Sequence, residues 1–161
     1  EAYLNLTLFP RITINGANAE VTKIQGNKTF IISLGNNSVI DSVRIVGNRS
    51  GYGIIAGNDN FTIKNTHFSD LRFAIYVGNT SVSANGYNIS VGNIVNNTVW
   101  NATGYAGAFG AAITLRNSAS NNIRGVTIAN NSIYNATTAI DLVSEGQGQG
   151  GIVSEIIVGT I

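Results

Sequence analysis

The sequence predicts an all-β fold, a parallel β-solenoid of about four to five coils, on three observations. First, NIVNNTVWNAT at residues 93–103 recurs as TIANNSIYNAT at residues 127–137, an offset of 34 positions. Second, short β-branched and aromatic runs alternate with Gly and Asn turns, and no stretch has the period of a three-turn amphipathic helix. Third, like side chains recur at equivalent places in successive units, which stacked coils require and a β-sandwich does not.

Each repeat unit reads as a short strand, an Asn-rich turn, a second short strand, another turn and an apolar third strand. The turns vary in length, so the anchoring isoleucines are separated by 18 to 34 residues. We expect interior ladders of Ile45, Ile63, Ile94 and Ile128, of Ile54, Ile75, Ile113 and Ile140, and of Phe68, Val99 and Ile133. Asn65, Asn96 and Asn130 are expected at a corner, where Asn tolerates a left-handed backbone.

The units divide a single solenoid domain, residues 1–161, into four parts. Residues 1–35 alternate with period two and predict N-terminal strands or a first coil, with a bend or edge at Pro10. Residues 36–144 carry the repeat coils. Residues 145–151 are rich in Gly and Gln and predict a flexible linker. Residues 152–161 predict an apolar terminal strand.

The pattern x-x-I-x-N-N-x-I-x-N, followed by an A-I-x-L strand, resembles the pectin-lyase-like superfamily of right-handed parallel β-helices. Within that superfamily it is similar to the NosD-like repeats of secreted archaeal and bacterial proteins. The resemblance covers about residues 36–144. It implies a right-handed parallel β-helix and says little about activity, because that fold hosts lyases, hydrolases, phage spikes and plain scaffolds.

Composition excludes several classes of function. Charged residues make up only 11% of the chain and the net charge is +1, so nothing favours nucleic acid or an anionic membrane as a partner. Cysteine is absent, which excludes disulfides and thiolate metal sites. No apolar run reaches the roughly 20 residues of a membrane helix. Methionine is absent too, so we interpret the chain as a processed mature form or an excised fragment.

No motif for catalysis, metal or cofactor binding emerges, and we predict neither an enzyme nor a cofactor. The chain lacks the aspartate cluster of a pectate lyase and the Gly-His-Gly and Arg-Ile-Lys stretches of a polygalacturonase. Stacked coils can still bring Asp41, Asp59 or Asp70 together, and glycoside hydrolysis needs two carboxylates within about 10 Å. The single histidine, His67, lacks the nucleophile elbow of a triad. Trp100, Tyr134 and Phe109 are candidates to line a sugar groove, with packing as the alternative.

Asn-x-Ser/Thr sequons are the one signal above background. There are 11 of them, against about four expected from the numbers of Asn, Ser and Thr. The repeat itself generates some of them, yet many lie outside its best-matched part. We therefore predict dense N-glycosylation, an extracellular or cell-surface location and an archaeal source. The sequons begin at Asn5, Asn27, Asn36, Asn48, Asn60, Asn79, Asn88, Asn96, Asn101, Asn130 and Asn135.

A short solenoid leaves an open edge and an apolar cross-section at each end. We predict a structural glycoprotein subunit that self-assembles head to tail into a filament or cell-surface layer, by strand exchange or by end-on stacking. Its partners are copies of itself and covalent glycans. A polysaccharide-binding or polysaccharide-degrading β-helix protein and a viral or adhesion spike remain alternatives. The predicted interface residues are Tyr3, Leu4, Leu6, Leu8, Ile152, Val153, Ile156, Ile157, Val158 and Ile161.

Overall fold

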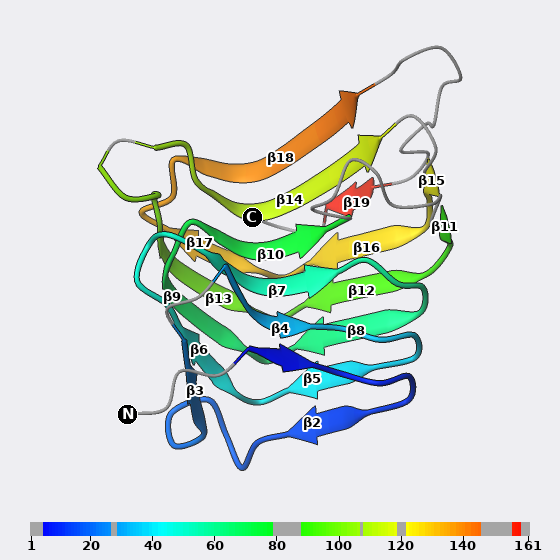
Figure 1. Cartoon of the computed structure of the whole chain (residues 1–161), viewed down its shortest axis with the longest axis horizontal. Coiled ribbons are helices and arrows are strands. Elements are labelled where there is room, and N and C mark those ends of the chain that lie inside the picture. Colours follow the sequence, from blue (N-terminus) through cyan, green and yellow to red (C-terminus); the bar gives the residue numbers. More distant parts are fainter. Residues whose placement is uncertain are drawn as a thin grey trace.

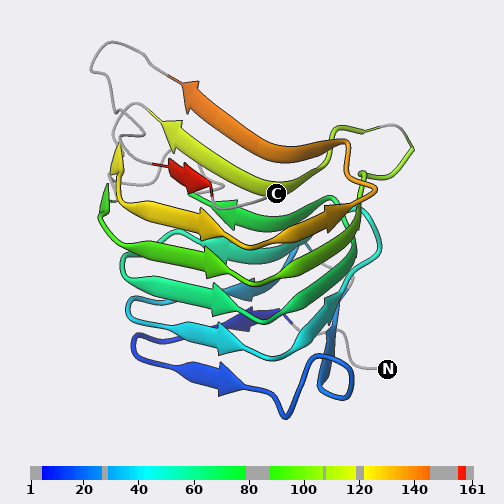
Figure 2. The ribbon, with the colours of Figure 1, turned by 180° about the vertical axis from the view of Figure 1, so that it is seen from behind.

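A computed structural model describes residues 5–26, 29–78, 88–106, 108–118, 122–145 and 156–158. These residues contain strands and no helix, and every strand pair is parallel. The chain is an all-β parallel β-helix, as the repeat predicted. Figure 1 looks onto one wall of the coil stack, and Figure 2 shows the opposite wall from behind.

Three parallel sheets form the walls of the stack. Sheet A contains β1 (Leu6–Thr7), β4 (Phe30–Ser33), β7 (Tyr52–Ala56), β10 (Phe73–Val77), β14 (Ala111–Ser118) and β18 (Thr138–Glu145). Sheet B contains β2 (Thr13–Asn15), β5 (Val39–Asp41), β8 (Phe61–Lys64), β12 (Gly92–Val95), β16 (Val126–Ala129) and β19 (Ile156–Val158). Sheet C contains β3 (Lys23–Gln25), β6 (Arg44–Val46), β9 (His67–Leu71), β13 (Thr98–Ala102) and β17 (Ser132–Tyr134).

The chain visits the sheets in the order A, B, C and so completes five turns, from β1–β2–β3 to β14–β16–β17. Strands β18 and β19 begin a sixth turn. A separate pair, β11 (Asn88–Ile89) and β15 (Asn122–Ile123), adds a small parallel ladder to the fourth and fifth turns. Apart from the eight-residue strands β14 and β18, the strands have two to five residues, because one coil offers each wall only a few residues before the next corner.

Interior ladders of like side chains form the core. In sheet A, Ile54, Ile75, Ile113 and Ile140 stack as predicted, and in sheet C so do Phe68, Val99 and Ile133. The prediction for Ile45 was wrong. Ile45 pairs with Phe68 in sheet C, and Ile40 takes its place below Ile63 in sheet B. Ser42 stands where later coils have the corner asparagine, so the sequence pattern did not reveal which strand of this coil pairs with β8.

From the second coil to the fifth, the corner between sheets B and C contains one left-handed residue per coil. Ser42, Asn65, Asn96 and Asn130 occupy equivalent positions with φ of 57°, 50°, 56° and 54°. Asn adopts this conformation more readily than most residues, because its short polar side chain bonds locally. The predicted asparagine corner is therefore confirmed, and its side chains point outward, where Asn65, Asn96 and Asn130 are exposed.

The residue after each left-handed corner is buried, and here asparagines form a hydrogen-bonded ladder. Asn97 accepts the Thr66 N–H at 3.1 Å and donates to the Ile63 carbonyl at 3.0 Å. Asn131 repeats this one coil higher, accepting the Asn97 N–H at 2.9 Å and donating to the Ile94 carbonyl at 2.8 Å. The ladder satisfies backbone groups that the turn would otherwise leave buried and unpaired.

Candidate functional site

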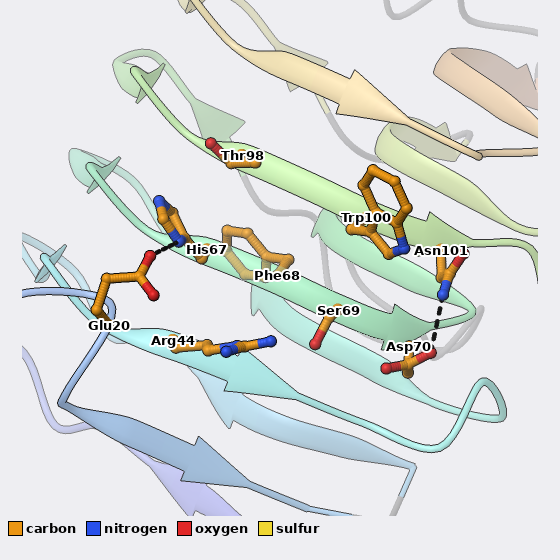
Figure 3. A pocket seen from close by; sticks show the side chains of 9 residues that line it. All are labelled: Glu20, Arg44, His67, Phe68, Ser69, Asp70, Thr98, Trp100 and Asn101. Atoms are coloured by element: carbon orange, nitrogen blue, oxygen red, sulfur yellow. Dashed lines mark hydrogen bonds and ion pairs between the residues drawn. The ribbon is translucent and has the colours of Figure 1, made fainter.

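A groove of about 400 Å³ runs over the outer face of sheet C (Figure 3). Side chains alternate along a strand, so every second residue of β6, β9 and β13 faces outward while its neighbours fill the core. The loop before β3 adds one wall, and the corner after sheet C adds the other. The groove is lined by Glu20, Arg44, His67, Phe68, Ser69, Asp70, Thr98, Trp100 and Asn101.

The groove gathers two acidic and two basic side chains. His67 Nδ1 lies 3.2 Å from Glu20 Oε1, and the Glu20 side chain is 71% exposed. Asp70 accepts from Asn101 Nδ2 at 3.2 Å and lies 3.5 Å from Arg49. Exposed pairs of this kind contribute about 1 kcal/mol or less, so they leave these groups available to a ligand.

Arg44 lies along the floor of the groove and points toward Ser69 (Figure 3). Its backbone N–H bonds the Thr22 carbonyl, but within the described part of the chain its guanidinium makes no hydrogen bond or ion pair, so the side-chain donors are unused. Ser69 is only 7% exposed, and its buried hydroxyl has no hydrogen-bond partner. A buried hydroxyl without a partner costs on the order of 1–3 kcal/mol, which a bound ligand or water offering an acceptor would recover.

An aromatic pair stands beside the groove. Trp100 and Tyr134 are register partners on β13 and β17, with ring centroids 5.5 Å apart and planes 38° apart. They are 51% and 49% exposed, so the pair presents flat apolar surface to solvent. Phe109, the third aromatic residue predicted for a sugar groove, packs instead against Phe73 on the side of sheet A, with ring centroids 6.0 Å apart. The structure brings together two of the three predicted aromatics.

The three aspartates considered for a carboxylate pair lie at three different corners and do not meet. Asp41 sits at the B–C corner and accepts from Asn65 Nδ2 at 2.8 Å, with Lys64 Nζ 3.1 Å away. Asp59 sits at the A–B corner and accepts the N–H groups of Ser90 and Val91 at 2.6 and 2.9 Å. Asp70 sits at the C–A corner. The carboxylates therefore connect successive coils at separate corners.

These contacts lower the pKa of two of the carboxyl groups, those of Asp41 and Asp59. Burial raises the pKa of Asp41, but hydrogen bonds from Asn65, Ser42 and Lys64, with the charge of Lys64, outweigh it and lower the pKa below 3.8. Burial likewise raises the pKa of Asp59, and backbone hydrogen bonds from Val91, Ser90 and Asn60 outweigh it. Among the described residues no group of three or more His, Cys, Asp or Glu side chains is placed to hold a metal ion.

The two ends of the stack differ from its middle. Leu115 and Val77 are fully buried on sheet A, whereas Leu142, one coil above Leu115 in the same ladder, is 50% exposed. At the lower end, Leu6, Ile14 and Ile24 occupy ladder positions but are only partly buried. Among the described residues, ladder positions at each end are thus more exposed than their partners in the middle coils. Sequence reasoning missed Leu142, although its position two residues after Ile140 marks it as inward-facing.

The predicted interface residues fall into three groups. Leu8 is buried in the core cluster, and Leu6 is partly buried against that cluster and pairs with Ile32. The strand that contains Ile156, Ile157 and Val158 pairs with β16 of the same chain, so here it extends sheet B. The remaining five lie outside the described residues: Tyr3, Leu4, Ile152, Val153 and Ile161.

Most of the described sequon asparagines are exposed. Asn101 is half-buried, and the exposed set comprises Asn5, Asn36, Asn48, Asn60, Asn96, Asn130 and Asn135. Asn27 and Asn79 lie outside the described residues, as does the side chain of Asn88. Three of the sequon amides bond the coil below: Asn60 donates to Asn37, Asn101 to Asp70 and Asn135 to Asn101.

The comparisons with known proteins found no match to a family model, to a curated protein or to a solved structure. No helix in the described part of the chain is long and apolar enough to cross a membrane.

Proposed function

We propose that this chain is a non-enzymatic structural subunit of an extracellular, N-glycosylated filament or surface layer, assembled by end-on stacking of coils. The observation that carries the proposal is the exposure of Leu142. The same ladder position is buried in the coil below and half exposed at the top of the stack. A second copy placed on this end would bury it.

The edges support the same arrangement. Strands β17, β18 and β19 end the three sheets at the top, and β1, β2 and β3 end them at the bottom. All strands run parallel, so the lower edge of one copy continues the pairing of the upper edge of another. Continued register would lay Leu6 of the copy above over Ile140. A head-to-tail contact of this kind generates an open filament instead of a closed oligomer.

End-on stacking is favoured over strand exchange as the joint. The terminal strand β19 already pairs with β16 in its own chain, and exchange would first have to break that pairing. A truncation that ends at Gly151 separates the two mechanisms. We expect the shortened chain still to assemble through β17 and β18, whereas a joint made by exchange of the terminal strand would lose assembly completely.

The proposed export and glycosylation rest on the sequons. The exposure of most described sequon asparagines supports the proposal, because glycans attached there would keep a chain with few charges soluble. We further infer that the coils are related to the NosD-like repeats of the pectin-lyase-like superfamily, which the isoleucine ladders and asparagine corners support. An experimental structure with left-handed coils would contradict that relationship.

The test of assembly is a charge placed on the exposed ladder position. Leu142→Lys puts an ammonium on the stacking surface at an already exposed site, so the subunit should fold and assembly should fail. Val91→Lys is the matched control, because Val91 is 45% exposed in a middle coil. Negative-stain microscopy and sedimentation of both variants give the answer. Filaments formed equally by both variants would rule out end-on stacking at this surface.

A further inference from the structure

We propose that the groove on sheet C, together with the Trp100–Tyr134 pair, binds a sugar ring. Ligand sites combine an apolar or aromatic surface with a few polar groups that fix orientation. Here the aromatic pair offers two half-exposed side chains at the groove, and Arg44, Ser69 and Asp70 offer donors and acceptors in its lining. A pyranose has this dual character, with apolar C–H faces and a rim of hydroxyl groups.

The unpartnered Ser69 hydroxyl is the independent sign that a ligand belongs there. It is buried in the groove wall without a hydrogen bond, beside a guanidinium that has no partner among the described residues. Thr114 is the other buried hydroxyl without a partner among the residues that the structure describes, but its strand, β14, lies in sheet A, away from this groove. A sugar hydroxyl or carboxylate accepting from Arg44 and Ser69 would satisfy both groups at once.

The sugar has two possible sources, a free polysaccharide or an N-glycan of this protein. An N-glycan would start close to the groove. Asn101 lines the groove, Trp100 directly precedes it, and Tyr134 directly precedes Asn135 one coil above. A glycan on either asparagine would start beside the aromatic pair. This second source rests on the proposed glycosylation, whereas the first does not.

The first arm of the test uses chain made in a host that adds no N-glycans. Trp100 is the single tryptophan, so its fluorescence reports on the groove alone. The probes are cellohexaose, chitohexaose and hexagalacturonate. Binding of a free sugar predicts a saturable change in emission, weakened about tenfold or more by Arg44→Gln or Ser69→Ala. Arg124→Gln, an exposed arginine outside the groove, should leave the affinity unchanged.

The second arm compares chain from a glycosylating host with the same chain made without glycans. Thr103→Val and Thr137→Val together remove the two sequons and keep both asparagines. Stacking of the chain's own glycan predicts a Trp100 emission shift in the glycosylated protein that this double variant abolishes. Ser38→Val, which removes the Asn36 sequon at another corner, should preserve the shift.

Either positive arm supports the sugar site and identifies its source. If free sugars leave Trp100 emission unchanged and glycosylation of Asn101 or Asn135, verified by mass spectrometry, also leaves it unchanged, the proposal is overturned. The same holds if neither sequon carries a glycan and the first arm is negative. Loss of the sugar site would leave filament formation untouched, since the groove lies on the side wall and the proposed joints lie at the ends.

Discussion

The middle coils and the terminal coils place side chains at the same ladder positions, but these side chains are buried in the middle and partly exposed at the ends. Leu115 and Ile113 are fully buried, whereas Leu142 is half exposed and Ile140 is only partly buried one coil higher. The lower end shows the same change from Ile40 to Ile14. At these ladder positions, full burial requires a coil both above and below. A terminal coil is therefore a complete structural unit that lacks one neighbour.

The largest expected effect contrasts two leucines on one ladder. Leu115→Ala should lower the free energy of unfolding by about 2–5 kcal/mol, because it opens a cavity in a packed core. Leu142→Ala should cost the isolated subunit less than about 1 kcal/mol, because half of the side chain already contacts water. Urea denaturation of the two variants measures both values. Equal losses would mean that the upper end is covered in the isolated chain.

The asparagine ladder tests the same difference between middle and terminal coils, with smaller expected losses in the free energy of unfolding. Asn97→Ala leaves the Thr66 N–H and the Ile63 carbonyl buried without partners and should cost about 2–3 kcal/mol. Asn131→Ala should cost about 1 kcal/mol, since Asn131 is 8% exposed near the open end and water can replace it, whereas Asn97 is 1% exposed. Thermal unfolding followed by circular dichroism ranks the two variants. The reverse order would contradict an open upper end.

The smallest expected effect is the pH dependence of the carboxylates that join neighbouring coils. The folded-state pKa of Asp41 is depressed below 3.8, so its contribution is present above that value and is lost as pH falls through the folded pKa. Because the Asp41–Lys64 pair is partly exposed, its contribution to the free energy of unfolding is well under about 1 kcal/mol. Asp41→Asn should narrow the drop in melting temperature between pH 5 and pH 2.5. An unchanged drop would exclude Asp41 as a contributor.

Much of this architecture could be predicted from the sequence, because a stacked coil repeats its own side chains. The isoleucine ladders of sheet A and the left-handed asparagine corners both follow from the repeat. Ile45 was assigned to the wrong ladder because Ser42 stands where later coils carry asparagine. The groove could not be predicted, since Arg44, Ser69 and Trp100 come from three coils and meet only once the register between those coils is known.

The central claim is that the open ends of the stack join copies into a filament that continues the coil axis. Fibre diffraction or cryo-electron microscopy of the assembled native protein tests it most directly. Five to six strands spaced about 4.8 Å apart predict an axial rise of about 24–29 Å per subunit, with strands perpendicular to the filament axis. A protein that remains monomeric at high concentration, or a filament whose strands run along its axis, would contradict the account.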